Sequence, residues 1–317
     1  MCLIDSSTKL LLHGDDLTDS SLHGVPLTNQ GVVVSSDQSK FGGKSLYFNG
    51  SSRLLFPASA ITFGSDDFTI DWWEYCTAAS GGTRFSSCYM SDKSLFGGLL
   101  IGYRQNVIYA STGTNVWDIL SGVAMLSATV NQWVHWAVVR QGNTLKTYRN
   151  GTVFATAAFN GSLLSYPSDP MAVGDYDTGD PAPFSGYIDE FRITQKAVWT
   201  ADFIPPDNPY FILGDVPAVT VVPKLLKAGE VLNISWEPAS GEGVTYTLER
   251  QINGGEYEAV YSGSELCFSE AAQGNWKTIR YRVKPSIGET QGSYRESSAA
   301  RVYTLSNYSG FIIGGGV

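Results

Sequence analysis

Short runs in which hydrophobic and polar side chains alternate fill residues 8–206, and clusters of Gly, Asn, Ser and Asp separate them. Successive side chains of a β-strand point to opposite faces, so this alternation predicts strands with one face in a core. No segment has a persuasive amphipathic helix period. The pattern therefore predicts an all-β protein that contains a two-sheet antiparallel sandwich.

The sharpest turn signal is Asn150-Gly151, which separates two strand-like runs. A type I′ turn requires positive φ at both central residues, and Asn-Gly is a pair that tolerates it. A second turn at residues 141–143 joins the preceding strand in the same way. We therefore expect a three-stranded meander over residues 133–159.

The alternation within residues 186–194 breaks once, at Asp189-Glu190. Ile188 lies three residues before Phe191, so a strict period of two would place these two side chains on opposite faces. One extra residue at the carboxylate pair, a β-bulge, would return Ile188 to the core and turn a carboxylate sideways. We therefore expect a bulged strand here.

A second set of strands follows the first. Two adjacent prolines, Pro205 and Pro206, end the first set, because proline cannot sit in a central strand. Alternating segments then recur at the spacing typical of small sandwiches, at residues 231–236, 246–250, 257–261 and 279–283. We divide the chain into a first domain at residues 1–206, a linker at 207–214, a smaller sandwich at 215–306 and a Gly-rich C-terminal tail at 307–317.

Composition supports the all-β class and argues against other classes. The 34 Gly, 17 Tyr and 8 Trp favour short strands and tight turns. A net charge of −9 argues against nucleic-acid binding, which needs a basic stripe for the phosphate backbone. No apolar segment is long enough to cross a bilayer, and the first residues lack the features of a secretory signal. Without such a signal we expect free thiols at Cys2, Cys76, Cys88 and Cys267.

Six segments occur in an order that is typical of one fold family: residues 10–16, 41–50, 67–73, 133–140, 148–151 and 186–194. As an ordered set they resemble the concanavalin A-like, laminin-G-like jelly rolls, and the resemblance covers about residues 8–206. It implies a two-sheet jelly roll in which strands 9–13 and 186–194 are neighbours. The second sandwich resembles a fibronectin type III domain, with Trp236 in its core and Tyr281 as its tyrosine corner.

The jelly-roll fold includes enzymes, the endoglucanases among them. Their Glu-x-Asp-x-x-Glu signature, which places nucleophile and acid on one strand face, is absent. The three histidines, His13, His23 and His135, show no zinc-ligand pattern, and we expect His135 to be a hydrogen-bonded core residue. We therefore expect no catalytic activity. The alternative is a glycoside hydrolase whose two carboxylates meet only through space.

Calcium is the cofactor that the sequence favours. Hard cations bind several oxygen ligands, and two acidic loops together with the bulge supply carboxylates. Turn capping is the competing interpretation, because aspartate side chains accept hydrogen bonds from backbone amides in turns. The candidate ligands are Asp15, Asp16, Asp19, Asp175, Asp177, Asp180 and Asp189.

Carbohydrate recognition would use exposed aromatic rings, which stack on the faces of sugars. Trp117 and Tyr176 are the candidates, because each lies beside an aspartate, and Asp118 is the polar neighbour of Trp117. Trp73 and Tyr75 share the face of their strand opposite to the expected core face. We expect Trp73 to be buried beneath covering loops.

The whole chain resembles accessory proteins of bacteriophage virions, because a jelly roll precedes a fibronectin-like sandwich and a Gly-rich apolar tail without an export signal. We therefore expect a virion structural protein, a tail-associated adhesin or a head decoration, that assembles in the host cytoplasm and displays a carbohydrate-binding jelly roll. The expected partners are a host-surface glycan, other virion proteins and further copies of the chain through the tail. The alternatives are a carbohydrate-active enzyme and a scaffold without a ligand.

Overall fold

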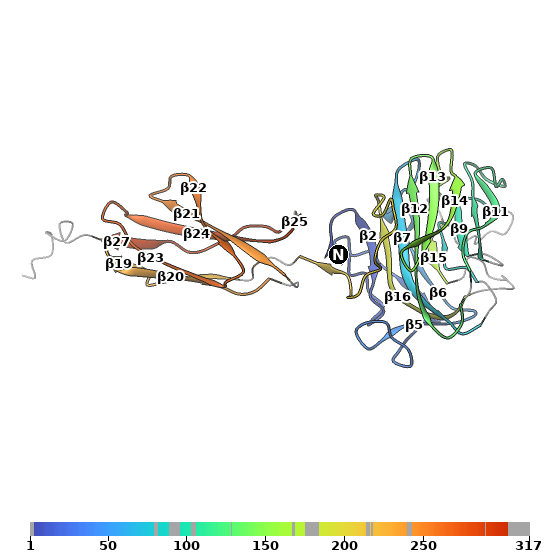
Figure 1. Cartoon of the computed structure of the whole chain (residues 1–317), viewed down its shortest axis with the longest axis horizontal. Helices are drawn as coiled ribbons and strands as arrows, with labels where there is room; N and C mark the ends of the chain where they lie inside the picture. Colours follow the sequence, from blue (N-terminus) through green and yellow to red (C-terminus); the bar gives the residue numbers. More distant parts are fainter. Residues whose placement is uncertain are drawn as a thin grey trace, which may run out of the picture. The chain divides into compact units, whose positions relative to one another are not determined.

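The computed structural model of the chain consists of strands, with a short 3-10 turn at Ala58–Ala60 (Figure 1). It describes residues 3–78, 82–88, 96–102, 106–127, 129–166, 169–174, 184–213, 216, 218–239, 243–288 and 290–303. The all-β prediction is confirmed, and the chain divides into two compact units at residues 1–210 and 211–317. Several residues named above lie outside the described part: Cys2, Asp175, Tyr176, Asp177, Asp180 and the tail at 307–317.

The first unit contains an eight-stranded antiparallel sheet, here called sheet 1, in the order β14-β13-β12-β7-β16-β5-β4, with β2 also paired to β16. Its strands are β2 (Thr8–Leu12), β4 (Val33–Ser35), β5 (Ser45–Asn49), β7 (Phe68–Cys76), β12 (Trp133–Gln141), β13 (Thr144–Arg149), β14 (Thr152–Ala158) and β16 (Ser185–Thr194). Phe191 of β16 lies opposite Leu12 of β2, so the predicted pairing of the two segments is confirmed.

Sheet 2 of the first unit has seven strands in the order β11-β10-β9-β8-β15-β6-β3. These are β3 (Thr28–Gln30), β6 (Arg53–Phe56), β8 (Phe85–Ser86), β9 (Leu99–Gly102), β10 (Val107–Ala110), β11 (Leu120–Ala124) and β15 (Met171–Val173), and β1 (Leu3–Ile4) precedes both sheets in the chain.

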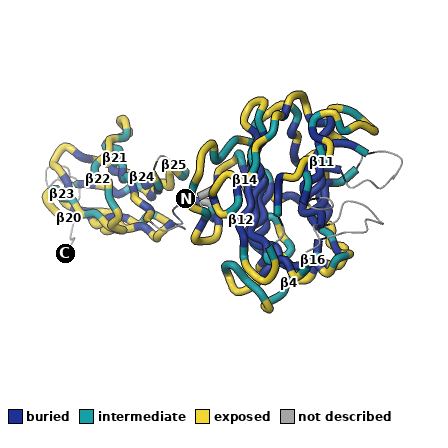
Figure 2. The backbone as a smooth tube through the Cα atoms, turned by 45° about the vertical axis from the view of Figure 1, so that its right-hand side comes forward, coloured by how far each residue is buried: buried dark blue, intermediate teal, exposed yellow. Residues whose placement is uncertain are grey.

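Sheets 1 and 2 enclose a single large hydrophobic core cluster, and Figure 2 shows the buried segments that run along its strands. Trp72, Trp136 and Phe191 of sheet 1 face Phe56 and Phe85 of sheet 2, and the ring centroids of Phe85 and Phe191 are 6.2 Å apart. Burial of such a ring stabilises the fold by about 1.5–3 kcal/mol relative to exposure. The core therefore fixes which face of each strand points outward.

The break in β16 is the predicted β-bulge. Asp189 lies opposite Trp73 and Arg192 lies opposite Asp71, so three steps along β16 match two along β7. Glu190 has a φ of 52°, a conformation that residues other than glycine adopt only occasionally. The extra residue places Ile188 in the core together with Phe191 and Ile193.

The Asn150-Gly151 turn also forms as predicted. Asn150 and Gly151 have φ values of 50° and 79°, and β12, β13 and β14 form the expected meander. A side chain at Gly151 would lie 1.8 Å from the carbonyl oxygen of Phe203. The amide of Phe203 also donates a 2.8 Å hydrogen bond to the carbonyl of Gly151. The turn therefore holds the segment that follows sheet 1.

The second unit contains a three-stranded sheet, β18-β20-β23, and a larger sheet, β19-β27-β24-β21-β22, to which β25 and β26 add through β24. The bounds are β17 (Phe211–Ile212), β18 (Val219–Val222), β19 (Leu225–Lys227), β20 (Val231–Trp236), β21 (Thr245–Ile252), β22 (Tyr257–Gly263), β23 (Cys267–Ala271), β24 (Thr278–Ile287), β25 (Thr290–Gln291), β26 (Arg295–Glu296) and β27 (Ala300–Tyr303). Trp236 is buried as predicted. Tyr281 is buried too, but its hydroxyl donates to the Glu270 carboxylate rather than to the backbone acceptor of a tyrosine corner.

The three described cysteines, Cys76, Cys88 and Cys267, are free thiols, as expected. Within the described residues, no helix has the length and apolar character needed to span a membrane.

Candidate functional site

Sheet 1 has an outward face, formed by the side chains that point away from the core. On β7 this face includes Asp71, Trp73 and Tyr75, because the alternating Ile70 and Trp72 belong to the core cluster. Each of these three side chains lies in a row that crosses the neighbouring strands. The three rows differ in chemistry and in what covers them.

The row through Tyr75 is apolar and aromatic over five strands, and we call it the aromatic row. Tyr75 lies opposite Trp133 of β12 and Tyr187 of β16, Tyr187 lies opposite Tyr47 of β5, and Tyr47 lies opposite Val33 of β4. Successive ring centroids are 5.0 Å apart for Tyr47 and Tyr187, 6.0 Å for Tyr187 and Tyr75, and 5.7 Å for Tyr75 and Trp133. The rings thus form a continuous row.

The aromatic row is accessible to solvent along most of its length. Tyr47, Tyr75 and Trp133 are half-buried, Tyr187 is 8% exposed, and Val33 at the end is 55% exposed. Neighbouring strands are separated by about 4.8 Å, so four spacings between five strands extend over about 19 Å. The row offers an extended surface of aromatic rings, whose planes are inclined to one another by 42° to 78°.

The second row, through Trp73, is covered by a loop. The Lys40 ammonium lies 3.9 Å from the centre of the Trp73 ring, and Phe41 packs edge-on against the same ring. Oδ2 of Asp189, which lies opposite Trp73, accepts hydrogen bonds from the amides of Lys40 at 2.8 Å and Phe41 at 3.1 Å. Trp73 is therefore buried, at 7% exposure, as we expected.

Two adjacent carboxyl groups at the bulge have raised pKa values. Burial raises the pKa of Asp189 to about 7, and its Oδ1 is buried without a hydrogen-bond partner among the described residues. Burial also raises the pKa of Glu190, whose Oε1 lies 2.7 Å from Nδ1 of His13 and whose Oε2 accepts the Tyr210 amide at 2.8 Å. For His13, burial lowers the pKa, but the Glu190 carboxylate outweighs it and raises the pKa above 6.5.

The third row contains a buried charged network. Asp71 accepts a 2.8 Å hydrogen bond from Nε of Arg192 and another from the Tyr210 hydroxyl. Burial raises the pKa of Asp71, but the Arg192 charge and these hydrogen bonds more than offset it, so the pKa lies below 3.8. His135 is fully buried, as expected, with Nε2 3.4 Å from Asp71, and burial lowers its pKa.

Residues 195–210, here called the strap, cover this network. The rings of Trp199 and Phe203 stack with their centroids 4.0 Å apart, and both present faces or edges to His135. Phe203 also packs on Tyr148 of β13. The chain therefore covers the second and third rows with its own segments, whereas the aromatic row stays open to a ligand.

A second buried ion pair lies between the sheets and has a structural role. Nε of Arg84 donates to the Glu74 carboxylate at 2.9 Å, and the indole nitrogens of Trp72 and Trp136 donate to it at 3.0 and 3.1 Å. Glu74 and Arg84 are each 1% exposed. Both carboxylate oxygens of Glu74 therefore already accept hydrogen bonds inside the fold.

The sequence candidates for sugar binding lie elsewhere. Trp117 stacks on Phe96, with ring centroids 5.4 Å apart, and packs at an angle of 54° against Tyr109 at 5.2 Å. Asp118 accepts the amide and hydroxyl of Thr112 at 2.8 and 2.6 Å, and these hydrogen bonds lower its pKa. Both candidates precede β11, the edge strand of sheet 2, whereas the aromatic row belongs to sheet 1.

Three of the calcium candidates that the structure describes, Asp16, Asp19 and Asp189, accept hydrogen bonds from backbone amides. Asp19 accepts the amides of Leu11, Ser21 and Val25 and the hydroxyl of Ser21. Asp16 caps Thr18, and Asp189 binds the loop amides described above. No group of three or more His, Cys, Asp or Glu side chains in the described part of the chain is placed to hold a metal ion. The calcium site therefore stays a prediction.

The aromatic row was not predicted from the sequence. The placement of Tyr75 on the face opposite to the core was predicted correctly, but its partners come from distant strands. The sequence did contain one usable signal. Tyr187 directly precedes the core residue Ile188, so alternation places its ring on the outward face of the strand. The register that aligns Tyr47, Tyr187 and Trp133 with Tyr75 is visible only in the folded sheet.

Comparison with known families agrees with this geometry. Residues 48–202 match the Laminin_G_3 family model, described as the concanavalin A-like lectin/glucanases superfamily. Residues 48–202 of the first unit therefore form a jelly-roll domain like those of this superfamily. A comparison with curated proteins found no match.

Solved structures also match part of this chain, at low sequence identity. Domain 4 of AbnA, an extracellular arabinanase of Geobacillus stearothermophilus solved with arabinotriose, is 17% identical, with a TM-score of 0.46 over 61% of this chain and 94% of that chain. The carbohydrate-binding module CBM66 of Bacillus subtilis is 16% identical, with a TM-score of 0.31 over 53% and 94%. Trypanosoma rangeli sialidase is 12% identical, with a TM-score of 0.41 over 62% of this chain but only 32% of the sialidase.

Proposed function

We propose that the jelly-roll domain binds a glycan chain on the aromatic row and does not cleave it. The observation that carries this proposal is the alignment of Tyr47, Tyr187, Tyr75 and Trp133 on four adjacent strands of one open sheet face. Apolar sugar faces pack well on aromatic rings, and the tyrosine hydroxyl groups supply donors and acceptors for sugar hydroxyls. The superfamily description, which includes lectins, supports the same class of ligand.

A glycoside hydrolase is the second candidate, and the carboxyl pair at the bulge is the observation that favours it. Asp189 and Glu190 lie next to the open row and have raised pKa values, as a general acid requires. Both are buried, however, at 0% and 2% exposure, and both hold backbone amides of the covering segments. Cleavage would require these hydrogen bonds to break, so binding without cleavage is the better-supported function.

The test compares two aromatic substitutions in the full chain. Trp133→Ala and Tyr47→Ala should each weaken glycan binding by about 1–3 kcal/mol, roughly the contribution of one packed aromatic face. Trp117→Ala is the matched control, because it removes a half-buried indole from the connection that precedes β11 of sheet 2. Binding is measured by affinity electrophoresis against a panel of soluble polysaccharides, and reducing ends are assayed in parallel.

Each outcome decides between the sites. Loss of binding in Trp133→Ala and Tyr47→Ala with retention in Trp117→Ala supports the aromatic row. The reverse pattern would move the site to the residues predicted from the sequence, and release of reducing ends that Asp189→Asn abolishes would favour the hydrolase. Absence of binding to every polysaccharide in the panel contradicts the proposal.

We also infer that the second unit is a fibronectin type III-like sandwich. Its sheets have the orders β18-β20-β23 and β22-β21-β24-β27, and Trp236 is buried, features that suit a sandwich of this kind. A crystal structure with a different strand order would contradict this assignment.

The virion role expected from the sequence remains our wider proposal. It rests on the resemblance of the two-domain order to phage accessory proteins. Mass spectrometry of purified particles should find the chain in them, and its absence would remove the virion role without affecting glycan binding.

A further inference from the structure

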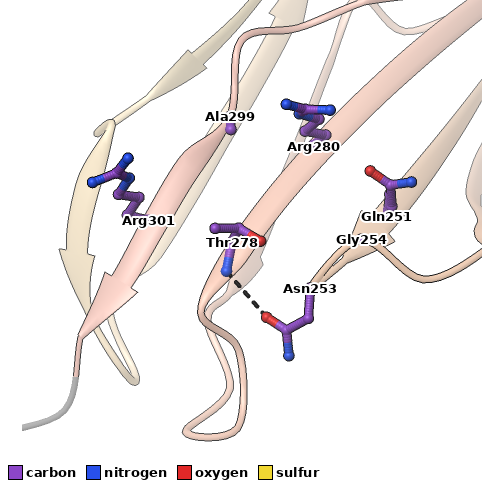
Figure 3. Close-up of a pocket in the computed structure, with 7 residues that line it drawn as sticks. All are labelled: Gln251, Asn253, Gly254, Thr278, Arg280, Ala299 and Arg301. Carbon is purple, nitrogen blue, oxygen red and sulfur yellow. Dashed lines mark hydrogen bonds between the residues drawn. The ribbon is translucent and has the colours of Figure 1, made fainter. Parts of the chain in front are cut away.

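A pocket of about 310 Å³ lies on the larger sheet of the second unit, and the jelly-roll site does not involve it. Its wall is formed by outward side chains of three adjacent strands, β21, β24 and β27, and by the turn after β21. Figure 3 shows Arg280, Arg301, Gln251 and Thr278 around this hollow, with Asn253 at its lower edge. The two guanidinium groups are the only charged groups among its lining residues in the described chain.

Strand alternation explains how the arginines reach the same face. In β24 the side chains of Ile279 and Tyr281 point into the core, so Thr278 and Arg280 point outward. Cross-strand pairing then places Gln251 of β21 opposite Arg280, and Arg301 of β27 opposite Thr278. The sheet therefore brings two cations from different strands to one outward surface.

The turn beside the pocket is rigidly held. Asn253 has a φ of 53°, and its side-chain oxygen accepts the amides of Lys277 at 2.7 Å and Thr278 at 3.1 Å. Its amide nitrogen donates to the carbonyl of Asn275 at 3.1 Å. Because these hydrogen bonds tie the turn to the start of β24, the pocket wall is formed before any ligand arrives.

The charges of the two pocket arginines are not neutralised within the described part of the chain. The next outward arginine of β24, Arg282, pairs with Glu249 of β21, and Arg250 pairs with Glu258 and Glu270. Arg280, by contrast, faces the neutral Gln251, and neither it nor Arg301 forms an ion pair with a described carboxylate. Two exposed cations at one concave site therefore lack a counter-charge, in a chain whose net charge is −9.

We propose that this pocket binds an oxyanion, a sulfate, phosphate or carboxylate group, between the guanidinium groups of Arg280 and Arg301. Guanidinium groups present parallel N–H donors that match two oxygens of such a group, and a bound anion removes the repulsion between the two arginines. Thr278 and Gln251 supply neutral polar atoms at the same wall. The anion is either a free ion or an acidic group on a saccharide, since both present the same oxygens.

The test is a sulfate titration of the full chain at constant ionic strength, with chloride as the balancing ion. Arginine Nε–H signals are followed by NMR. In the wild-type chain the signals of Arg280 and Arg301 should shift and saturate. Arg280→Gln and Arg301→Gln should each weaken sulfate binding about tenfold or more, because each removes a charged hydrogen-bond donor. Arg280→Lys should recover only part of the affinity, since it restores the charge without the fork of donors.

Arg295→Gln is the matched control, because Arg295 is exposed on β26 of the same sheet but does not line the pocket. It removes the same charge and should change sulfate binding less than twofold, as roughly expected for a screened distant charge. Equal losses in Arg295→Gln and Arg280→Gln would show diffuse attraction and overturn the site, as would the absence of a saturable shift in the wild type.

A second arm separates the two sources of the anion. Inorganic phosphate, acetate and a sulfated disaccharide are titrated under the same conditions. If the disaccharide binds at least about tenfold more tightly than sulfate, and Arg280→Gln removes the difference, the pocket is a site for acidic saccharides. Equal affinities support a site for the free ion. The result does not depend on the aromatic row, so failure of either proposal leaves the other intact.

Discussion

Replacing Asp189 with Asn tests how the bulge controls the outward face of sheet 1. The Asp189 side chain is fully buried, and one of its oxygens holds the loop amides of Lys40 and Phe41. An Asn oxygen can accept the same two hydrogen bonds. The substitution therefore keeps the loop anchored and removes only the ability to ionise.

The magnitude follows from the difference between the folded and unfolded pKa values. The pKa of Asp189 is about 7 in the folded chain and has an ordinary value of 3.8. Between these values the folded state binds the additional proton, so the free energy of unfolding decreases as pH rises from about 4 to about 7. The two pKa values differ by about three, and each pKa unit corresponds to about 1.4 kcal/mol, so the free energy of unfolding should be lower by up to about 4 kcal/mol at pH 8.

The Asn variant should lack this loss. At pH 8 the variant gains stability because it no longer buries an ionised carboxylate. Part of this gain is lost because the side-chain NH2 group of the Asn is buried without an acceptor, which costs about 1–3 kcal/mol. We therefore expect Asp189→Asn to be more stable than wild type at pH 8 by about 1–3 kcal/mol and slightly less stable at pH 5. His13 has a raised pKa as well, mainly through Glu190, so its contribution also declines with rising pH. The Asp189 charge contributes less to that shift than Glu190 does, so the decline should be slightly smaller in the Asn variant.

Denaturant unfolding followed by tryptophan fluorescence measures the effect, because six of the eight tryptophans belong to the first unit. Asp118→Asn is the control, since Asp118 is exposed and its pKa is lowered rather than raised. The reasoning is refuted if the difference in unfolding free energy between wild type and Asp189→Asn stays constant from pH 5 to pH 8.

Two further predictions concern the core and the metal. Arg84→Met should destabilise the first unit by about 3–5 kcal/mol, because it leaves the Glu74 carboxylate buried without its cation, and adding Glu74→Gln should restore part of the loss. Denaturant titration of the two single variants and the double variant measures the free energy of unfolding of each. Strictly additive losses of this free energy would contradict the prediction. Calcium should raise the melting temperature relative to chelator if some of the predicted ligands bind it, namely Asp15, Asp16, Asp19, Asp175, Asp177, Asp180 and Asp189. Identical melting curves would reject the calcium prediction.

The features predicted correctly from the sequence are those that depend on neighbouring residues. The bulge follows from the three-residue spacing of Ile188 and Phe191, and the hairpin follows from Asn150-Gly151. In each case, the pattern and its consequence lie within a few positions, so no tertiary information is needed. The burial of Trp73 was also expected, because a long chain with many loops can cover both faces of a sheet.

The aromatic row, by contrast, could not be predicted, because it depends on the register between strands that are far apart in the sequence. Tyr47 and Tyr187 lie 140 residues apart in the chain, yet their rings are 5.0 Å apart. The role of the aspartates was ambiguous for a different reason, because the same side chain caps a turn or binds a cation. Only the structure shows that the Asp19 oxygens are already occupied by amides and a hydroxyl.

The shape of the aromatic row favours a narrow ligand over a protein partner. An antiparallel sheet can present polar side chains on its solvent face, so aromatic side chains at four adjacent outward positions are not needed for folding. The strap and the Lys40 loop cover the other two rows, which shows that the chain has segments able to cover this face. One side-chain row about 7 Å wide and about 19 Å long offers roughly 130 Å². A standard protein interface buries about 800 Å² on each partner. A ligand only one sugar wide, which extends across the strands, fits the row without further contact area.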